Sequence, residues 1–201
     1  LFALPLVYNF PLHFGFVNFA LSMALALNAF ALWLRLARLG KLRLRSIVFV
    51  PLSCLLWLCH TYGWGMLGVL AFSAELIRQH DLRRREGVSR GFFSQWVLPW
   101  FAAGVQCLVL ALPMVLMLIW RSGEHVSGRT GDWFFWRSKM QWVTMILRDR
   151  WQFFDLACLA VLFLILFKGL RDPNIQHSRN LALSGLFLLA VFLLLPRVVF
   201  G

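Results

Sequence analysis

Two short segments hold the side chains that could bind a charged ligand. The first is HTYGWG, in which His60, Tyr62 and Trp64 alternate with smaller residues. A histidine at a helix end can contact a phosphate or the headgroup of a lipid carrier, and Tyr and Trp favour the membrane–water boundary. We therefore interpret these three residues as candidate substrate contacts. The alternative is that His60 is an interfacial histidine that holds a turn.

The second segment is WFFWRSKMQWVTMILRDRWQFFD, which contains Arg137, Lys139 and Arg148. Cationic side chains make strong, charge-assisted hydrogen bonds to phosphate, so these three residues are also candidate substrate contacts. Arg148, together with Asp149, Arg150 and Asp155, could bind an anionic donor or a catalytic metal ion. The alternative is a cluster of charges that faces lipid headgroups.

Motifs of familiar catalytic chemistry are missing from the sequence. It contains no GxSxG, P-loop, HExxH or dinucleotide-binding fingerprint. The 4 cysteines fall within predicted membrane spans and lack the spacing of a zinc site. We therefore assign no catalytic residue, and we predict neither a metal centre nor a cofactor.

The composition indicates a helical membrane protein. Of the 201 residues, 61% are hydrophobic and the mean hydropathy is +0.75, whereas ordinary soluble domains are about 45–50% apolar. The net charge of +12 lies in short loops between apolar runs, where the positive-inside rule explains it. We therefore expect membrane lipids as partners and no nucleic acid.

The distribution of these charges predicts the topology. The stretch from Arg45 to Arg78 could be one long helix or two short ones that turn at HTYGWG. With a turn, the loops 35–45, 78–90 and 168–179 share one side of the membrane and hold 13 of the 20 Lys and Arg residues. A single crossing gives no comparable bias. We therefore expect the turn, with these three loops in the cytoplasm.

The predicted fold is all-α, a polytopic bundle of about six transmembrane helices with one amphipathic interfacial helix. Aromatic and apolar residues recur every three or four positions after Trp133, which is typical of a helix lying flat on a membrane. We interpret residues 1–201 as a single transmembrane domain and as a fragment of a longer protein. The expected spans are 13–34, 46–59, 64–77, 95–120, 155–168 and 180–196, and the expected interfacial helix is 132–152.

Three polar or breaking residues within these spans have expected roles. Glu75 lies three residues before Arg78, a spacing that allows an ion pair on one helix face. Gln106 is expected to make a hydrogen bond between helices. Pro113 lies inside a predicted span and should kink its helix.

The helix pattern resembles the middle of a GT-C-type integral membrane glycosyltransferase. The resemblance rests on the span FGFVNFALSMALALNAFALWLRL, the basic loop after it, the short-helix hairpin turning at His60, and the next basic loop. It implies sugar transfer from a polyprenyl-phosphate donor on the extracytoplasmic face of a bacterial plasma (inner) membrane. In that family the catalytic acid usually lies upstream of the part matched here, so none is carried over. The alternative is a non-enzymatic multi-pass membrane protein or a transporter segment.

Overall fold

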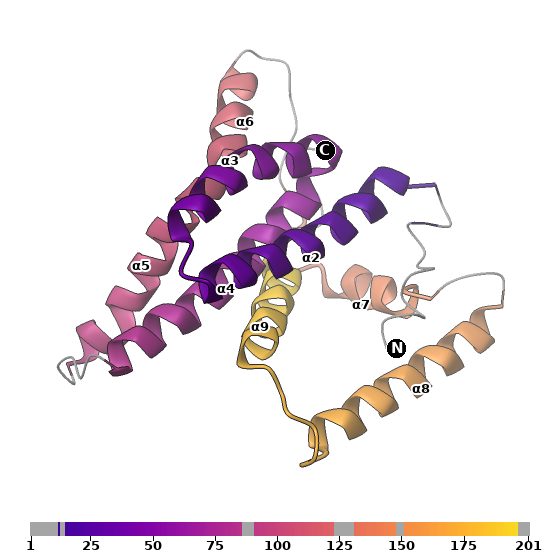
Figure 1. The fold of residues 1–201 in the computed structure, drawn as a ribbon. Helices are drawn as coiled ribbons and strands as arrows, with labels where there is room; N and C mark the ends of the chain where they lie inside the picture. The colour runs from indigo at the N-terminus through magenta and orange to yellow at the C-terminus, as the bar shows by residue number, and fades with distance from the viewer. Residues whose placement is uncertain (1–11, 13–14, 86–90, 123–130, 148–150, 197–201) are drawn as a thin grey trace.

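The computed structural model describes residue 12 and residues 15–85, 91–122, 131–147 and 151–196 (Figure 1). Within these ranges the chain is helical and forms no strand longer than an isolated bridge. The α-helices are α2 (Val17–Arg38), α3 (Leu42–Cys59), α4 (Thr61–Arg85), α5 (Leu98–Cys107), α6 (Leu112–Ser122), α7 (Trp136–Thr144), α8 (Gln152–Arg171) and α9 (Arg179–Leu194). A π-helical turn, η2 (Phe93–Val97), precedes α5, and a 3₁₀ turn, η3 (Leu108–Leu110), follows it.

Length and composition qualify four helical segments to cross a membrane. They are Val17–Arg38, Leu42–Cys59, Phe93–Leu110 and Gln152–Arg171. Helix α9 is equally apolar in character but has only 16 residues. The described part of the chain is therefore all-helical with four candidate membrane-spanning helices, compatible with a multi-pass membrane protein. The expected total of about six spans stays a prediction.

The first three described helices pack against one another in an up-and-down arrangement. Helix α3 ends at Cys59, His60 adopts an extended conformation, and α4 begins at Thr61 and packs against both α2 and α3 (Figure 1). At this end Gly63 approaches α2 so closely that a Cβ atom would lie 2.6 Å from the Cβ of Ser22. Small residues allow such close approach between helices in lipid. The chain thus doubles back at HTYGWG.

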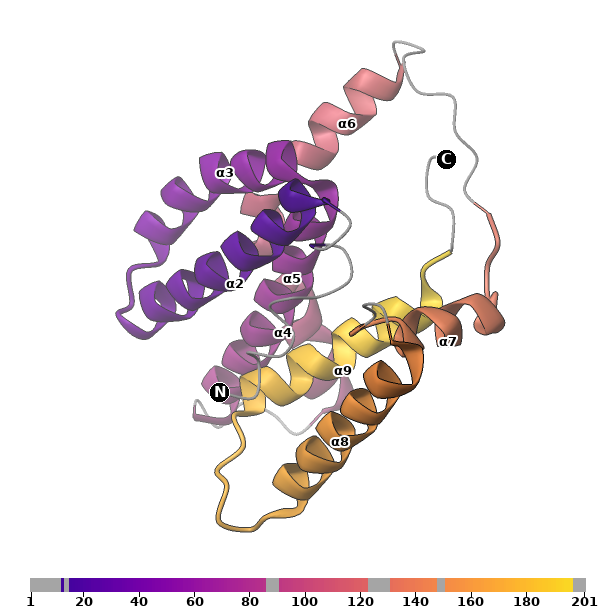
Figure 2. The ribbon, with the colours of Figure 1, turned by 90° about the vertical axis from the view of Figure 1, so that its right-hand side faces the viewer.

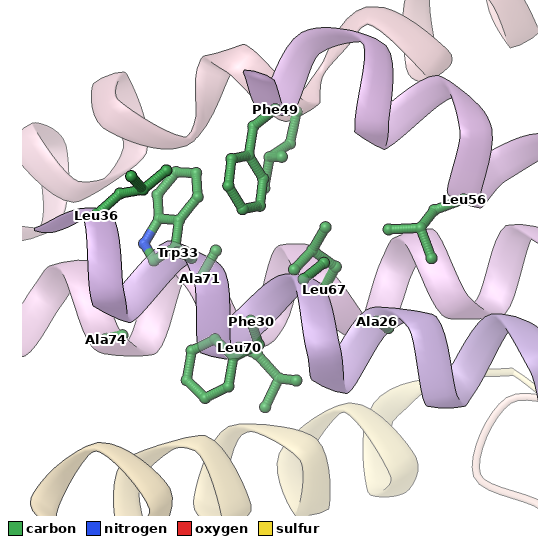
Figure 3. Packing of buried hydrophobic residues seen from close by; sticks show 12 residues of the cluster. Ala26, Phe30, Trp33, Leu36, Phe49, Leu56, Leu67, Leu70, Ala71 and Ala74 are labelled. Atoms are coloured by element: carbon green, nitrogen blue, oxygen red, sulfur yellow. The ribbon is translucent and has the colours of Figure 1, made fainter. Parts of the chain in front are cut away.

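The buried core lies among these three helices and extends to η3. Figure 3 shows the Trp33 and Phe49 rings side by side, and their centroids are 4.9 Å apart in an edge-to-face arrangement. Leu67, Ala71 and Ala74 supply the facing side of α4. Helices α5 and α9 also pack on α4, which makes α4 the central helix of the bundle.

The predicted span 95–120 is interrupted where the proline indicated a kink. Helix α5 ends at Cys107, the 3₁₀ turn η3 follows, and α6 begins at Leu112 with Pro113 in its first turn. Proline has no backbone N–H and cannot continue the hydrogen-bond ladder of the preceding helix. The kink predicted at Pro113 is therefore confirmed, and α5 and α6 are separate helices.

The segment expected to form the interfacial helix 132–152 is helical over a shorter range. Asp132 and Phe134 have positive φ angles of 57° and 60°, so regular helix starts only with α7 at Trp136. Helix α7 ends at Thr144, and α8 begins at Gln152. In both views α8 extends away from the helices α2 to α5 (Figure 2).

Candidate functional site

His60 holds the turn between α3 and α4. Its Nδ1 atom accepts a hydrogen bond from the backbone N–H of Tyr62 at 3.2 Å. Its ring stacks on the Tyr62 ring, with centroids 5.5 Å apart, and meets the Phe19 ring of α2 edge-on at 5.2 Å. These contacts favour the turn-holding alternative for His60. The Tyr62 side chain is half exposed beside it.

Trp64 makes its polar contact across the bundle. Its indole N–H donates to the carbonyl oxygen of Leu110 at 2.9 Å. In an unbroken helix the N–H of Met114 would bond to that carbonyl, but beside Pro113 it bonds to Ala111 instead. Trp64 thus satisfies a carbonyl group that the break at Pro113 releases. Nothing in the sequence around Trp64 indicates this partner.

The cations of the second candidate segment have different environments. Lys139 of α7 is buried, and its ammonium donates to the carbonyl oxygen of Leu193 at the end of α9. The same ammonium lies 5.3 Å from the Trp136 ring centroid and 5.9 Å from that of Phe192. Arg137 is exposed. The third cation, Arg148, lies outside the described residues.

Both candidate segments lie towards the same end of the bundle. Helix α9 runs antiparallel to α4, because Arg179 pairs with Asp81 at one end and Ser184 bonds to Ser73 nearer the middle. Lys139 contacts the last turn of α9, so α7 lies near the end of α4 that begins at the His60 turn. The structure does not merge the two segments into one cluster; each contacts its own neighbours.

A long apolar groove runs beside α4, between α5 and α9. One part has a volume of about 440 Å³, and the other about 670 Å³. Trp100 and Phe187 line both parts, so the two parts adjoin each other at these rings. The rings of Phe72, Trp100 and Phe187 meet there at centroid distances of 5.6 to 6.0 Å. We call this feature the α4–α5–α9 groove.

The two ends of the α4–α5–α9 groove differ in chemistry. His80 and Arg179 line one end, next to the arginine-rich loops. Trp133, from the segment before α7, lines the other end together with Leu194. Apolar walls with few polar groups are the usual composition of a site for a hydrophobic ligand. The groove therefore suits a long apolar chain.

A buried ion pair joins α3 to α4. The guanidinium of Arg45 donates to Glu75 at 3.0 Å, and both side chains are 1% exposed. Arg45 also donates to Gln106 of α5 at 2.9 Å and lies 3.9 Å above the Trp33 ring centroid. The interhelical hydrogen bond expected for Gln106 is therefore confirmed.

Glu75 has further donors on its own helix. Arg78 donates through Nε and Nη2 to one carboxylate oxygen, and the side-chain amide of Gln79 donates to the same oxygen at 2.9 Å. The pair of Glu75 with Arg78 expected from their spacing is thus present. Sequence reasoning placed Arg45 in a basic loop and missed it as the second, fully buried partner.

Among the described residues, no group of three or more His, Cys, Asp and Glu side chains is placed to hold a metal ion. The four cysteines are half-buried free thiols. No known protein family, curated protein or solved structure matches this chain. The candidate site is therefore argued from its geometry.

Proposed function

We propose that this chain is the membrane part of a glycosyltransferase that uses a polyprenyl-phosphate-linked sugar as its donor. The observation that supports the proposal is the α4–α5–α9 groove, whose two apolar parts adjoin each other at a cluster of aromatic rings. A polyprenyl chain is a long apolar ligand, and the groove offers it apolar and aromatic walls. The proposal places the protein in a bacterial plasma membrane.

The dimensions of the groove fit such a chain. Helix α9 lines it from Arg179 to Leu194, and 16 helical residues extend about 24 Å at 1.5 Å per residue. That length is close to the hydrocarbon thickness of a bilayer, which is about 30 Å. The two parts of the groove together therefore extend along most of one membrane depth, and a chain bound in both would pass over the ring cluster between them.

The end of the groove near α7 suits the donor phosphate. Trp133 lines this end, and the exposed Arg137 follows four residues later at the start of α7. An exposed guanidinium can bind a phosphate through two hydrogen bonds. We assign Arg137 to the donor phosphate and place this end outside the cytoplasm, because the arginine-rich loops lie at the opposite end.

The test is photo-crosslinking with a benzophenone-bearing polyprenyl phosphate in nanodiscs. Ala190 lines the groove, so Ala190→Trp should fill it and reduce crosslinking at least tenfold. Leu189 is 53% exposed on the same helix and does not line the groove, so Leu189→Trp is the matched control. Equal labelling of both variants and the unsubstituted protein would refute the groove assignment.

A second measurement distinguishes an enzyme from a membrane protein that only binds the lipid. Membranes containing the full protein should transfer radiolabelled sugar from the polyprenyl-phosphate donor, and Arg137→Gln should lower the rate. If crosslinking occurs but no sugar is transferred, the groove binds lipid in a non-enzymatic membrane protein or a transporter. If phospholipids displace the probe as well as polyprenyl phosphate does, the donor class is wrong.

A further inference from the structure

A second, more polar cavity lies between α2, α4 and α9 at the arginine-rich end of the bundle. Its volume is about 240 Å³, and Trp33, Arg38, Glu75, Arg78, Asp81 and Asn180 are among the residues that line it. It lies on a different side of α4 from the α4–α5–α9 groove, with Ile77 lining both. We call it the arginine cavity.

Positive charge exceeds negative charge around the arginine cavity. The carboxylate of Glu75 is bound by Arg45 and Arg78, and that of Asp81 is bound by Arg179 at 3.1 Å. Arg38 brings a fourth guanidinium to the wall. Among the described residues, four guanidinium groups thus surround two carboxylates, which leaves two positive charges without a compensating acid there.

The uncompensated donors belong to Arg38 and Arg78. Arg38 is exposed at the end of α2 and makes no hydrogen bond or ion pair with the described residues. Arg78 uses Nε and Nη2 for Glu75, so its Nη1 group is not engaged by that carboxylate. Both side chains line the same cavity, where two guanidinium groups can bind one phosphate from two directions.

The rear wall of the cavity strengthens binding of an anion. Trp33 is 1% exposed and excludes water from that side, and Ala74 of α4 lies beside it. Electrostatic attraction is stronger where water is excluded, because the local dielectric constant is lower. The cavity also adjoins loops that the charge pattern places at the level of lipid headgroups.

From these features we propose that the arginine cavity binds a phosphate monoester dianion through Arg38 and Arg78. The dianion matches the two uncompensated positive charges, whereas a phosphodiester would neutralise only one. The phosphate could be carried by the headgroup of a lipid such as phosphatidate, or it could be free in solution. This inference does not depend on the glycosyltransferase proposal, because it uses another cavity and another end of the bundle.

The test compares phosphatidate with phosphatidylglycerol on the purified chain by native mass spectrometry. Phosphatidate should be retained at least tenfold better, which corresponds to about 1.4 kcal/mol. Arg38→Gln should lower retention of phosphatidate about tenfold, and it should leave the fold intact because Arg38 has no partner among the described residues. Arg35→Gln is the matched control, since Arg35 is exposed in the same turn of α2 and does not line the cavity.

A thermal-shift assay with inorganic phosphate then identifies the source of the phosphate. A ligand that binds the folded state raises the unfolding temperature by mass action. Stabilisation of the unsubstituted chain but not of Arg38→Gln indicates a free anion, and retention of phosphatidate alone indicates a lipid headgroup. Equal losses in Arg38→Gln and Arg35→Gln, or equal retention of the two lipids, would overturn the proposal.

Discussion

Removing Glu75 should destabilise the bundle more than any other single loss of charge in it. The side chain of Arg45 is only 1% exposed, and the substitution Glu75→Leu removes its counter-ion. The hydrogen bond from Arg45 to Gln106 remains. Breaking a buried pair by removing one partner costs about 3–5 kcal/mol, because the remaining charge stays desolvated. We expect the free energy of unfolding to fall by that amount.

The reverse substitution should cost less. In Arg45→Met, the carboxylate of Glu75 keeps its hydrogen bonds from Arg78 and Gln79 and so remains compensated. The cost is then about 1–3 kcal/mol, mainly from the loss of charged hydrogen bonds to Glu75 and Gln106. In the double variant both buried charges are gone, and apolar replacements of a buried pair are often close to neutral. The two single effects should therefore not add.

The assay is denaturation of the purified chain by SDS in mixed micelles, followed by far-ultraviolet circular dichroism. Asp81→Leu is the matched control: it removes an acid from the same helix that also pairs with an arginine of another helix. The Asp81–Arg179 pair is exposed, with side chains 37% and 63% accessible, so its loss should cost less than about 1 kcal/mol. Equal effects of Glu75→Leu and Asp81→Leu would refute the argument from burial.

Two further predictions concern packing and topology. Gly63→Ala should lower the free energy of unfolding by about 1–3 kcal/mol, because the new Cβ atom would meet the Ser22 backbone at 2.8 Å. Gly65→Ala is the control and should not lower it, because no atom lies within 4 Å of a Cβ at that position. Equal SDS denaturation midpoints for the two variants would contradict this prediction. In a cysteine-free background, Tyr62→Cys should react with an impermeant maleimide from outside intact cells and Arg84→Cys only after lysis, whereas labelling of both from outside would exclude the proposed topology.

The sequence predicts the helices and the reversal at HTYGWG well, because both depend on local features. Apolar runs bounded by charge locate helices, and a proline within such a run locates the break at Pro113. The reversal follows from counting arginines in short loops. The length of α7 could not be predicted from such local features. The strong periodicity after Trp133 predicts a longer helix than the nine residues found.

The buried ion pair could be predicted only in part. Glu75 and Arg78 share a helix, so their spacing indicates the pair, whereas Arg45 is 30 residues away and reaches Glu75 through the packing of α3 on α4. One signal was present in the sequence: Arg45 lies four residues before Phe49, which is in turn four before Ser53, and all three are buried on one face of α3. A count of charges treats every arginine as exposed, so it misses that Arg45 lies on the buried face of α3.

The roles of His60, Trp64 and Lys139 show why residue type alone misjudges a membrane site. In lipid, each backbone carbonyl that a helix end or a break releases needs a donor, since no water is present to supply one. Trp64 donates to Leu110 beside the break, and Lys139 donates to Leu193 at the end of α9. Aromatic and cationic side chains near the spans thus serve as hydrogen-bond donors to backbone carbonyl groups. Arg137 is exposed and makes no such bond within the described residues.

Helix α4 presents different side chains to α2 and α3 than to the proposed binding surface. Its Gly63, Ala71 and Glu75 face α2 and α3, where close packing and the buried ion pair fix the helices at both ends. Phe72 and Ile77 instead line the apolar groove shared with α5 and α9. Helix association in lipid gains little from apolar contact alone, because lipid tails offer equivalent contacts. The Phe72 ring also packs against Trp100 of α5 and Phe187 of α9, so a substitution there changes helix packing as well as the groove.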